Sequence, residues 1–180
     1  MSESLVSLIL ATAALGAVTV SVVLLFGVEL RTAAPLRRLV SEQGQAMALA
    51  VAVVATAGSL YYSEIVGFLP CEYCWYQRIA MYPLAVLLAV AVVTRQHLAM
   101  RYTMAIAGIG LALSVYHYQL QLFPEQGSSC VGGVSCTVML VQQFGFVSIP
   151  FMAGAGFLSI LLIRMAEWRA TLLRDLHDAE

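Results

Sequence analysis

The sequence predicts an all-α integral membrane protein. Apolar residues make up 61% of its 180 residues and charged residues only 11%, whereas a soluble domain has roughly 25% charged residues. The mean hydropathy is +0.88, and the apolar runs lack the two-residue alternation of a membrane β-barrel. The same composition excludes intrinsic disorder. A net charge of −1 leaves no basic surface that would indicate a nucleic-acid partner.

Five apolar segments approach the length needed to cross a membrane. A hydrocarbon core of about 30 Å takes about 20 helical residues. The first segment and the last carry no charge, the second is interrupted by Glu64 alone, the third lies between Arg78 and Arg95, and the fourth contains His117. We therefore expect five transmembrane helices, within residues 5–28, 46–69, 79–94, 102–124 and 144–163.

The arginines predict the orientation. Eight of the nine basic residues lie after the first span, between the third and fourth spans, or after the fifth, and these segments share one face. The positive-inside rule makes that face cytoplasmic, which places the N-terminus outside. The exception on the outer face is Arg78. The eight are Arg31, Arg37, Arg38, Arg95, Arg101, Arg164, Arg169 and Arg174.

The first span is expected to be a retained helix. It lacks the positively charged start of a signal peptide, and its apolar run is too long for one. Ala13, Ala17 and Ser21 form a row of small residues at four-residue spacing, which can pack against a neighbouring helix. We expect residues 31–45 to be a partly helical linker, and residues 164–180 to continue the last helix as a fraying tail. Both are predicted to be solvated.

All four cysteines lie in the two predicted outer loops. Cys71 and Cys74 precede the third span, and Cys130 and Cys136 precede the fifth. Cysteines on an oxidising face persist as disulfides or redox groups, and four cysteines allow three pairings. A Cys-x-x-Cys at a helix start is suited to thiol–disulfide exchange, because the helix N-terminus favours the nucleophilic thiolate.

Two other interpretations of the cysteines stay open. Four thiolates can bind one tetrahedral zinc ion, although the gap between Cys130 and Cys136 is wider than in most zinc knuckles and the oxidising face disfavours thiolate ligands. Two inert structural disulfides are the second alternative. A ring as small as Cys71–Cys74 would constrain the unfolded chain very little, so a redox role is the preferred interpretation.

Arg78 and His117 are the charge-capable side chains near the cysteines. Arg78 follows Cys74 by four residues, so both lie on one side of a helix with Cβ atoms about 5–6 Å apart. It can stabilise a Cys74 thiolate or another developing anion; the alternative is an anchor at the membrane interface. His117 lies inside the fourth span, where an ionisable group is a functional candidate, or a core histidine bonded to a backbone carbonyl.

A disulfide-forming centre must pass on two electrons. The sequence has no glycine-rich nucleotide motif, no haem Cys-x-x-Cys-His and no Rossmann pattern. An apolar acceptor dissolved in the bilayer needs only a slot between helices beside the cysteines and a donor for its carbonyl oxygens. Arg78 and His117 supply such donors, so the expected acceptor is a lipid quinone.

The assembled motifs resemble the DsbB/BdbC family of disulfide bond formation proteins. The resemblance covers about residues 44–165 and implies a four-helix transmembrane bundle in a bacterial plasma membrane. Residues 1–43 are then an extra N-terminal transmembrane helix with its linker, and 166–180 a cytoplasmic tail. The matching motifs are CEYCWYQRI at 71–79, SVYHY at 114–118, the pair Cys130 and Cys136, and FGFVSIP at 144–150.

This resemblance implies a quinone-dependent protein-disulfide oxidoreductase. Its partner would be an exported thioredoxin-fold thiol oxidase of the DsbA/BdbD type, and its electron acceptor ubiquinone or menaquinone in the membrane lipid. Cys130 would be attacked by the reduced partner, and Cys136 would pass the electrons to Cys71. Cys74 would meet the quinone ring, Arg78 would polarise a quinone carbonyl, and His117 matches the family's histidine.

The chain also departs from part of that family. Cys130 and Cys136 are only six positions apart, as in the BdbC branch, so the order of the disulfide relay is open. Gln77 stands where the other branch has glutamate. A vitamin K epoxide reductase-like enzyme or a reductive thiol relay would also use cysteines and a quinone, but these lack the WYQR continuation at 75–78.

Overall fold

Five long helices form the molecule. The computed structural model describes residues 3–29, 34–126 and 135–178. Within these ranges the chain has no β-strand beyond one isolated bridge between Gln143 and Val147, which confirms the all-α fold class. The helices are α1 (Glu3–Gly27), α2 (Ala34–Leu60), α3 (Glu72–Val93), α4 (Met100–Leu122) and α5 (Ile149–Asp178), with a π-turn η1 (Tyr61–Ile65) and a 3₁₀ turn η2 (Pro124–Gln126).

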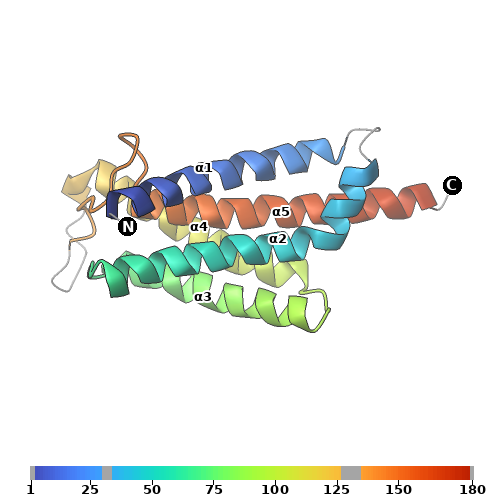
Figure 1. Cartoon of the computed structure of the whole chain (residues 1–180), viewed down its shortest axis with the longest axis horizontal. Helices are drawn as coiled ribbons and strands as arrows, with labels where there is room; N and C mark the ends of the chain where they lie inside the picture. The colour runs from blue at the N-terminus through green and yellow to red at the C-terminus, as the bar shows by residue number, and fades with distance from the viewer. Residues whose placement is uncertain (1–2, 30–33, 127–134, 179–180) are drawn as a thin grey trace.

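The helices run side by side, and successive helices point in opposite directions (Figure 1). Helix α5 packs against α1, α2 and α4, while α3 packs against α2 and α4. A buried core joins α2, α3, α4 and α5. Phe157 of α5 fits against Gly110 of α4 so closely that a Cβ at Gly110 would lie 2.3 Å from its ring. The described parts of the two predicted outer loops lie at the same end of the bundle as the start of α1 (Figure 1).

Four segments are long and apolar enough to cross a membrane: α1, Ala34–Ile65, α3 and Ile149–Leu176. Helix α4 has 23 residues, which is about 35 Å of helix, but its buried face carries polar side chains that lower its hydropathy. They are Thr103, Ser114, His117 and Gln121. The predicted membrane bundle is confirmed, whereas the count of five spans stays a prediction.

The predicted linker is part of α2. The helix begins at Ala34, and Val40 is fully buried. Arg174 of α5 donates a hydrogen bond of 2.6 Å to Ser41, and Gln45 donates one of 2.9 Å to the carbonyl of Gln96. The prediction that these residues are solvated is wrong for this face, since Val40, Gly44 and Ala48 recur every four residues and so line one side of a helix.

The predicted solvated tail is also packed. Helix α5 continues without interruption past residue 165, and Ala166 and Ala170 are fully buried. They join Val40 and the end of α1 in a second apolar cluster, which includes Leu24 and Leu25 of α1 and Val28 just after it. The division of the chain at residues 43 and 165 stays a prediction, but packing crosses both boundaries.

Candidate redox site

The two cysteines of the first outer loop meet at the start of α3. Cys71 is the N-cap residue, and its sulfur accepts a hydrogen bond of 3.4 Å from the backbone N–H of Cys74. Both cysteines are free thiols, with their sulfur atoms 3.0 Å apart. The helix turn thus holds the dithiol in a position from which a disulfide can close, at the helix end where a negative charge is most favourable.

His117 reaches this dithiol from α4. Its Nε2 lies 3.5 Å from the sulfur of Cys71, and its side chain is 2% exposed. The ring also lies beside Tyr73, with the ring centroids 5.7 Å apart. Within the described residues Nδ1 has no hydrogen-bond partner. The alternative of a core histidine bonded to a backbone carbonyl therefore does not describe this contact.

The charge of the dithiol falls on Cys71. The hydrogen bond from the Cys74 thiol, and then that from His117, lower the pKa of Cys71 to about 4 although burial raises it. Two sulfur atoms 3.0 Å apart do not both ionise readily, because like charges repel strongly at that distance. The thiolate of the reduced pair is therefore on Cys71, with Cys74 as the hydrogen-bond donor, whereas the sequence favours a thiolate at Cys74.

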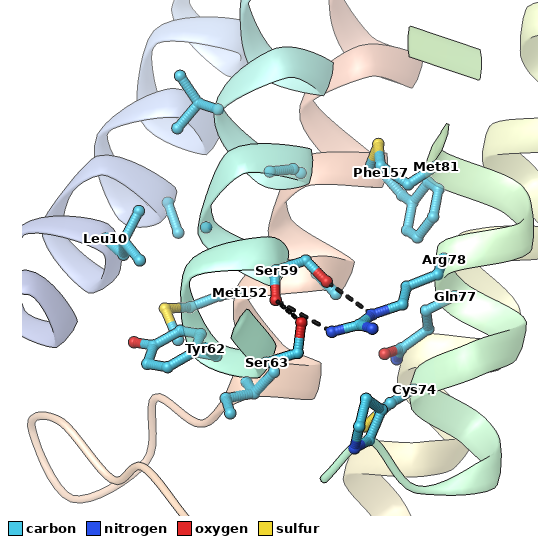
Figure 2. Close-up of a pocket in the computed structure, with 18 of the residues that line it drawn as sticks. Leu10, Ser59, Tyr62, Ser63, Cys74, Gln77, Arg78, Met81, Met152 and Phe157 are labelled. Carbon is cyan, nitrogen blue, oxygen red and sulfur yellow. Dashed lines mark hydrogen bonds between the residues drawn. The ribbon is translucent and has the colours of Figure 1, made fainter. Parts of the chain in front are cut away.

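Arg78 is held between α3 and α2 (Figure 2). Its Nε donates to the hydroxyl of Ser59 and its Nη2 to the Ser59 carbonyl, each at 3.0 Å. Tyr82 donates to the same hydroxyl at 3.2 Å, and the guanidinium carbon lies 5.3 Å from the centre of the Trp75 ring. Among the described residues Ser59 is the hydrogen-bond acceptor for Arg78, so further guanidinium N–H groups are available to a ligand.

Three polar residues to which the sequence analysis gave no role connect the elements around His117. Gln77, buried on α3, donates a hydrogen bond of 3.1 Å to Ser114, which donates one of 2.8 Å to the Gly110 carbonyl. Gln121 of α4 donates to the carbonyl of Val138 at 3.2 Å and so holds the second outer loop. The sequence could have indicated a role for Gln77, Ser114 and Gln121, because they are polar side chains within apolar helices.

Two cavities meet at Cys74. The larger, of about 330 Å³, lies among α1, α2, α3 and α5 and is lined by Cys74 and Arg78 among many apolar side chains. The smaller, of about 220 Å³, lies under the second outer loop and is lined by Cys71, Cys74 and His117. The structure thus places Arg78 and His117 in different cavities on either side of the dithiol, rather than in one shared slot.

The described half of the second cysteine pair also lies next to the dithiol. Cys136 is 1% exposed and forms one buried cluster with Cys71 and Leu120. Cys136 is disulfide-bonded, while the site predicted at Cys130 lies outside the described residues. A tetrahedral site of four cysteine thiolates does not fit this arrangement, because a disulfide sulfur is not a thiolate ligand.

Similarity to known sequences establishes the family. The sequence model of the family "Disulfide bond formation protein DsbB" matches residues 41–173. The chain belongs to the DsbB family. It is therefore a membrane-bound member of a family of disulfide-forming oxidoreductases, a role that implies an exchanging thiol partner.

Individual relatives agree with this assignment. The chain is 47% identical over 117 residues to a "Probable disulfide formation protein" of Oceanobacillus iheyensis, which covers 63% of this chain and 81% of the relative. It is 43% identical over 114 residues to "Disulfide bond formation protein C" of Bacillus subtilis, which covers 62% and 83%. No solved structure gives a significant match. The resemblance read from the sequence motifs is thereby confirmed.

Proposed function

We propose that this DsbB-family protein is a thiol:quinone oxidoreductase. It takes two electrons from an exported thioredoxin-fold thiol oxidase and passes them to a membrane quinone, either ubiquinone or menaquinone. The observation that carries the proposal is the position of Cys74, which lines both a cavity under the second outer loop and an apolar cavity between the helices. One dithiol is thus accessible to two different kinds of substrate.

The partner's electrons enter through the second outer loop. A partner thiolate attacks Cys130, which forms a mixed disulfide and frees Cys136. Cys136 then attacks Cys71 of the oxidised first pair and frees Cys74. The partner's second thiol closes its own disulfide and releases Cys130, which re-forms its bond with Cys136 and frees Cys71. The buried cluster of Cys136 with Cys71 supports this transfer between loops.

The net result is a reduced pair at Cys71 and Cys74 beside a loop disulfide. That is the oxidation state of the structure, with Cys71 and Cys74 free and Cys136 disulfide-bonded. Closing the Cys71–Cys74 disulfide releases two electrons and two protons. A quinone supplies the acceptor for both and leaves as the quinol, so atoms and electrons balance over one cycle.

The larger cavity fits such an acceptor. Its volume of about 330 Å³ lies in the range of roughly 300–1,000 Å³ usual for small-molecule sites. Its walls are mainly apolar, and the thiol of Cys74 and the guanidinium of Arg78 lie together at one end. Arg78 is oriented by Ser59 to hold a carbonyl oxygen beside that thiol.

The proposed orientation has five spans, the N-terminus outside and both cysteine loops outside the cytoplasm of a bacterial cell. In the structure the start of α1 lies at the same end as the start of α3 (Figure 1). Arg95, Arg101 and Arg174 belong to the segments that lie at or lead to the opposite end. This separation supports the positive-inside assignment.

An anaerobic assay tests the proposed function. The purified protein is mixed with a reduced thioredoxin-fold oxidase and a soluble quinone analogue, and the quinone absorbance is followed. We expect catalytic loss of the quinone band in the wild type and none above the uncatalysed rate in Cys74→Ser. A wild type that reduces no quinone while it still exchanges disulfides with the partner would refute the proposal.

A further inference from the structure

Helix α1 lines the larger cavity although it lies outside the segment that matches the family. The family match begins at residue 41, whereas α1 ends at Gly27. The cavity is nevertheless lined from α1 by one large side chain and three small ones, which are Leu10, Ala13, Ala14 and Ala17. The extra helix is thus part of the site that the family segment shapes on its other sides.

The outer half of α1 is fixed to α2. Tyr62 donates a buried hydrogen bond of 3.0 Å to Ser7, a strong positional constraint in an apolar environment. One helical turn further in, Leu10 lies over Gly58, where a Cβ would come within 3.2 Å of its side chain. The two helices therefore approach closely at this end and run in opposite directions.

The inner half of α1 is fixed as well. Leu24 and Leu25 in its last turns, and Val28 just after it, are buried against Val40 of α2 and against α5. Arg169 of α5 also forms a salt bridge with Glu29, just beyond the helix end. Between these two attachments the small side chains of Ala13, Ala14 and Ala17 leave space, so α1 spans the cavity as a fixed wall.

The cavity is longer than a quinone ring requires. Along η1 and α2 its lining runs from Ser63, near the cysteines, to Ala50, which is about 20 Å along a helix. Polar groups cluster near Cys74 and Arg78, while the part between α1 and α2 is lined by alanine, valine and leucine. In Figure 2, Leu10 of α1 and Arg78 of α3 lie on opposite sides of this space.

We propose that α1 forms the wall that holds the isoprenoid tail of the quinone. This inference rests on the proposed function, because it assigns the tail of the same acceptor whose ring lies beside Cys74. The elongated apolar space between Ala14, Ala17 and α2 suits an extended hydrocarbon chain, and α1, attached at both ends, forms one wall of it.

The proposed role of α1 is tested by measuring quinone binding rather than enzymatic turnover. Quenching of Trp75 fluorescence, in a Trp168→Phe background, reports quinone near Arg78. We expect Ala14→Phe, and to a smaller extent Ala17→Leu, to raise the dissociation constant of a long-tailed quinone about tenfold. A tailless analogue should bind all variants alike. The matched control is Val20→Phe, an exposed α1 position outside the cavity lining.

A second measurement uses the unaltered protein. A quinone with a photoreactive group in its tail should label a peptide containing residues 10–17. Labelling confined to α2 and α5, or an unchanged affinity for the long-tailed quinone in both filled variants, would overturn the role of α1. If the wild type binds neither the long-tailed nor the tailless quinone, the proposed function itself fails, and the inference fails with it.

Discussion

The Nε2 atom of His117 lies 3.5 Å from the sulfur of Cys71, although the two residues are 46 positions apart in the sequence. The contact connects the last turns of α4 to the N-cap of α3, and it is buried on both sides. It gives the Cys71 thiolate a second stabilising neighbour besides Cys74. The reduced dithiol therefore has a defined charged member before any substrate arrives.

The first prediction concerns the titration of that thiolate. Because the pKa of Cys71 is lowered from 9.0 to about 4, its thiolate should persist at neutral pH and be lost as the pH falls through about 4. The difference in absorbance at 240 nm between reduced and oxidised protein measures it. Cys74→Ala should raise the midpoint most, since the Cys74 hydrogen bond is the largest cause, and His117→Ala should raise it less.

The control for this titration is His97→Ala, which alters an exposed histidine at the other end of the bundle. It should leave the midpoint unchanged. A midpoint near 9 in the wild type would show that neither neighbour stabilises the thiolate. A midpoint unaffected by His117→Ala would limit the stabilisation to Cys74.

The second prediction concerns Arg78. A charge-assisted hydrogen bond contributes roughly 1.5–3 kcal/mol, so Arg78→Ala should weaken quinone use by about ten- to a hundredfold, as a raised KM, a lowered rate or both. Arg78→Lys keeps the charge but loses the planar fork, and should fall between. Ser59→Ala should have a smaller effect in the same direction, because it removes only one of the two contacts that orient the guanidinium.

The rate of quinone reduction is measured at a saturating concentration of the reduced partner. Disulfide exchange at the loop cysteines is followed in a separate assay. Arg101→Ala, which removes an arginine beside Tyr102 far from the cysteines, serves as the control and should behave as wild type. If Arg78→Ala folds and reduces quinone normally, Arg78 is an interfacial anchor and the acceptor site lies elsewhere.

The third prediction concerns the order of the relay. In Cys136→Ser, Cys130 is a free thiol that attacks the disulfide of the oxidised partner, and Cys136 is no longer present to displace the partner, so a covalent adduct between the partner and Cys130 should accumulate on a non-reducing gel. Cys130→Ser should give no adduct through this route. Equal adduct in the two variants would show that the loop pair does not act in the proposed order.

The fourth prediction concerns orientation. In the oxidised protein the native cysteines are paired, so a single added cysteine reports its own side of the membrane. Glu125→Cys, at an exposed position of η2, should react with a membrane-impermeant maleimide in intact cells. Arg95→Cys, exposed at the opposite end, should react only after permeabilisation, and the reverse pattern would invert the topology.

The helices could be predicted from sequence because an apolar run of membrane length has few alternatives to a helix. The packing of residues outside those apolar runs could not be predicted from the sequence. Val40 and Ala170 stand among charged residues, and their burial depends on α1, α2 and α5 meeting at one place. The polarity of Gln77 and Ser114 marked them as unusual, but their mutual hydrogen bond follows from how α3 and α4 face each other.

In the candidate site, too, the sequence predicts which residues lie close together but not which contacts orient them. A spacing of four residues sufficed to place Arg78 on the same side of α3 as Cys74. It carried no information on Ser59, which is 19 positions away and sets the direction of the guanidinium. Likewise the sequence placed His117 near the cysteines, but the packing of α4 against α3 determines that it contacts Cys71.

The shared position of Cys74 in two cavities has a chemical consequence beyond electron transfer. Quinone rings are electrophiles that add irreversibly to accessible thiols. In the proposed mechanism the partner's cysteines would approach from the loop side and the quinone ring from between the helices, with the dithiol in between. Reducing equivalents can pass from one substrate to the other while the two substrates remain physically insulated, which protects the partner's thiols from alkylation.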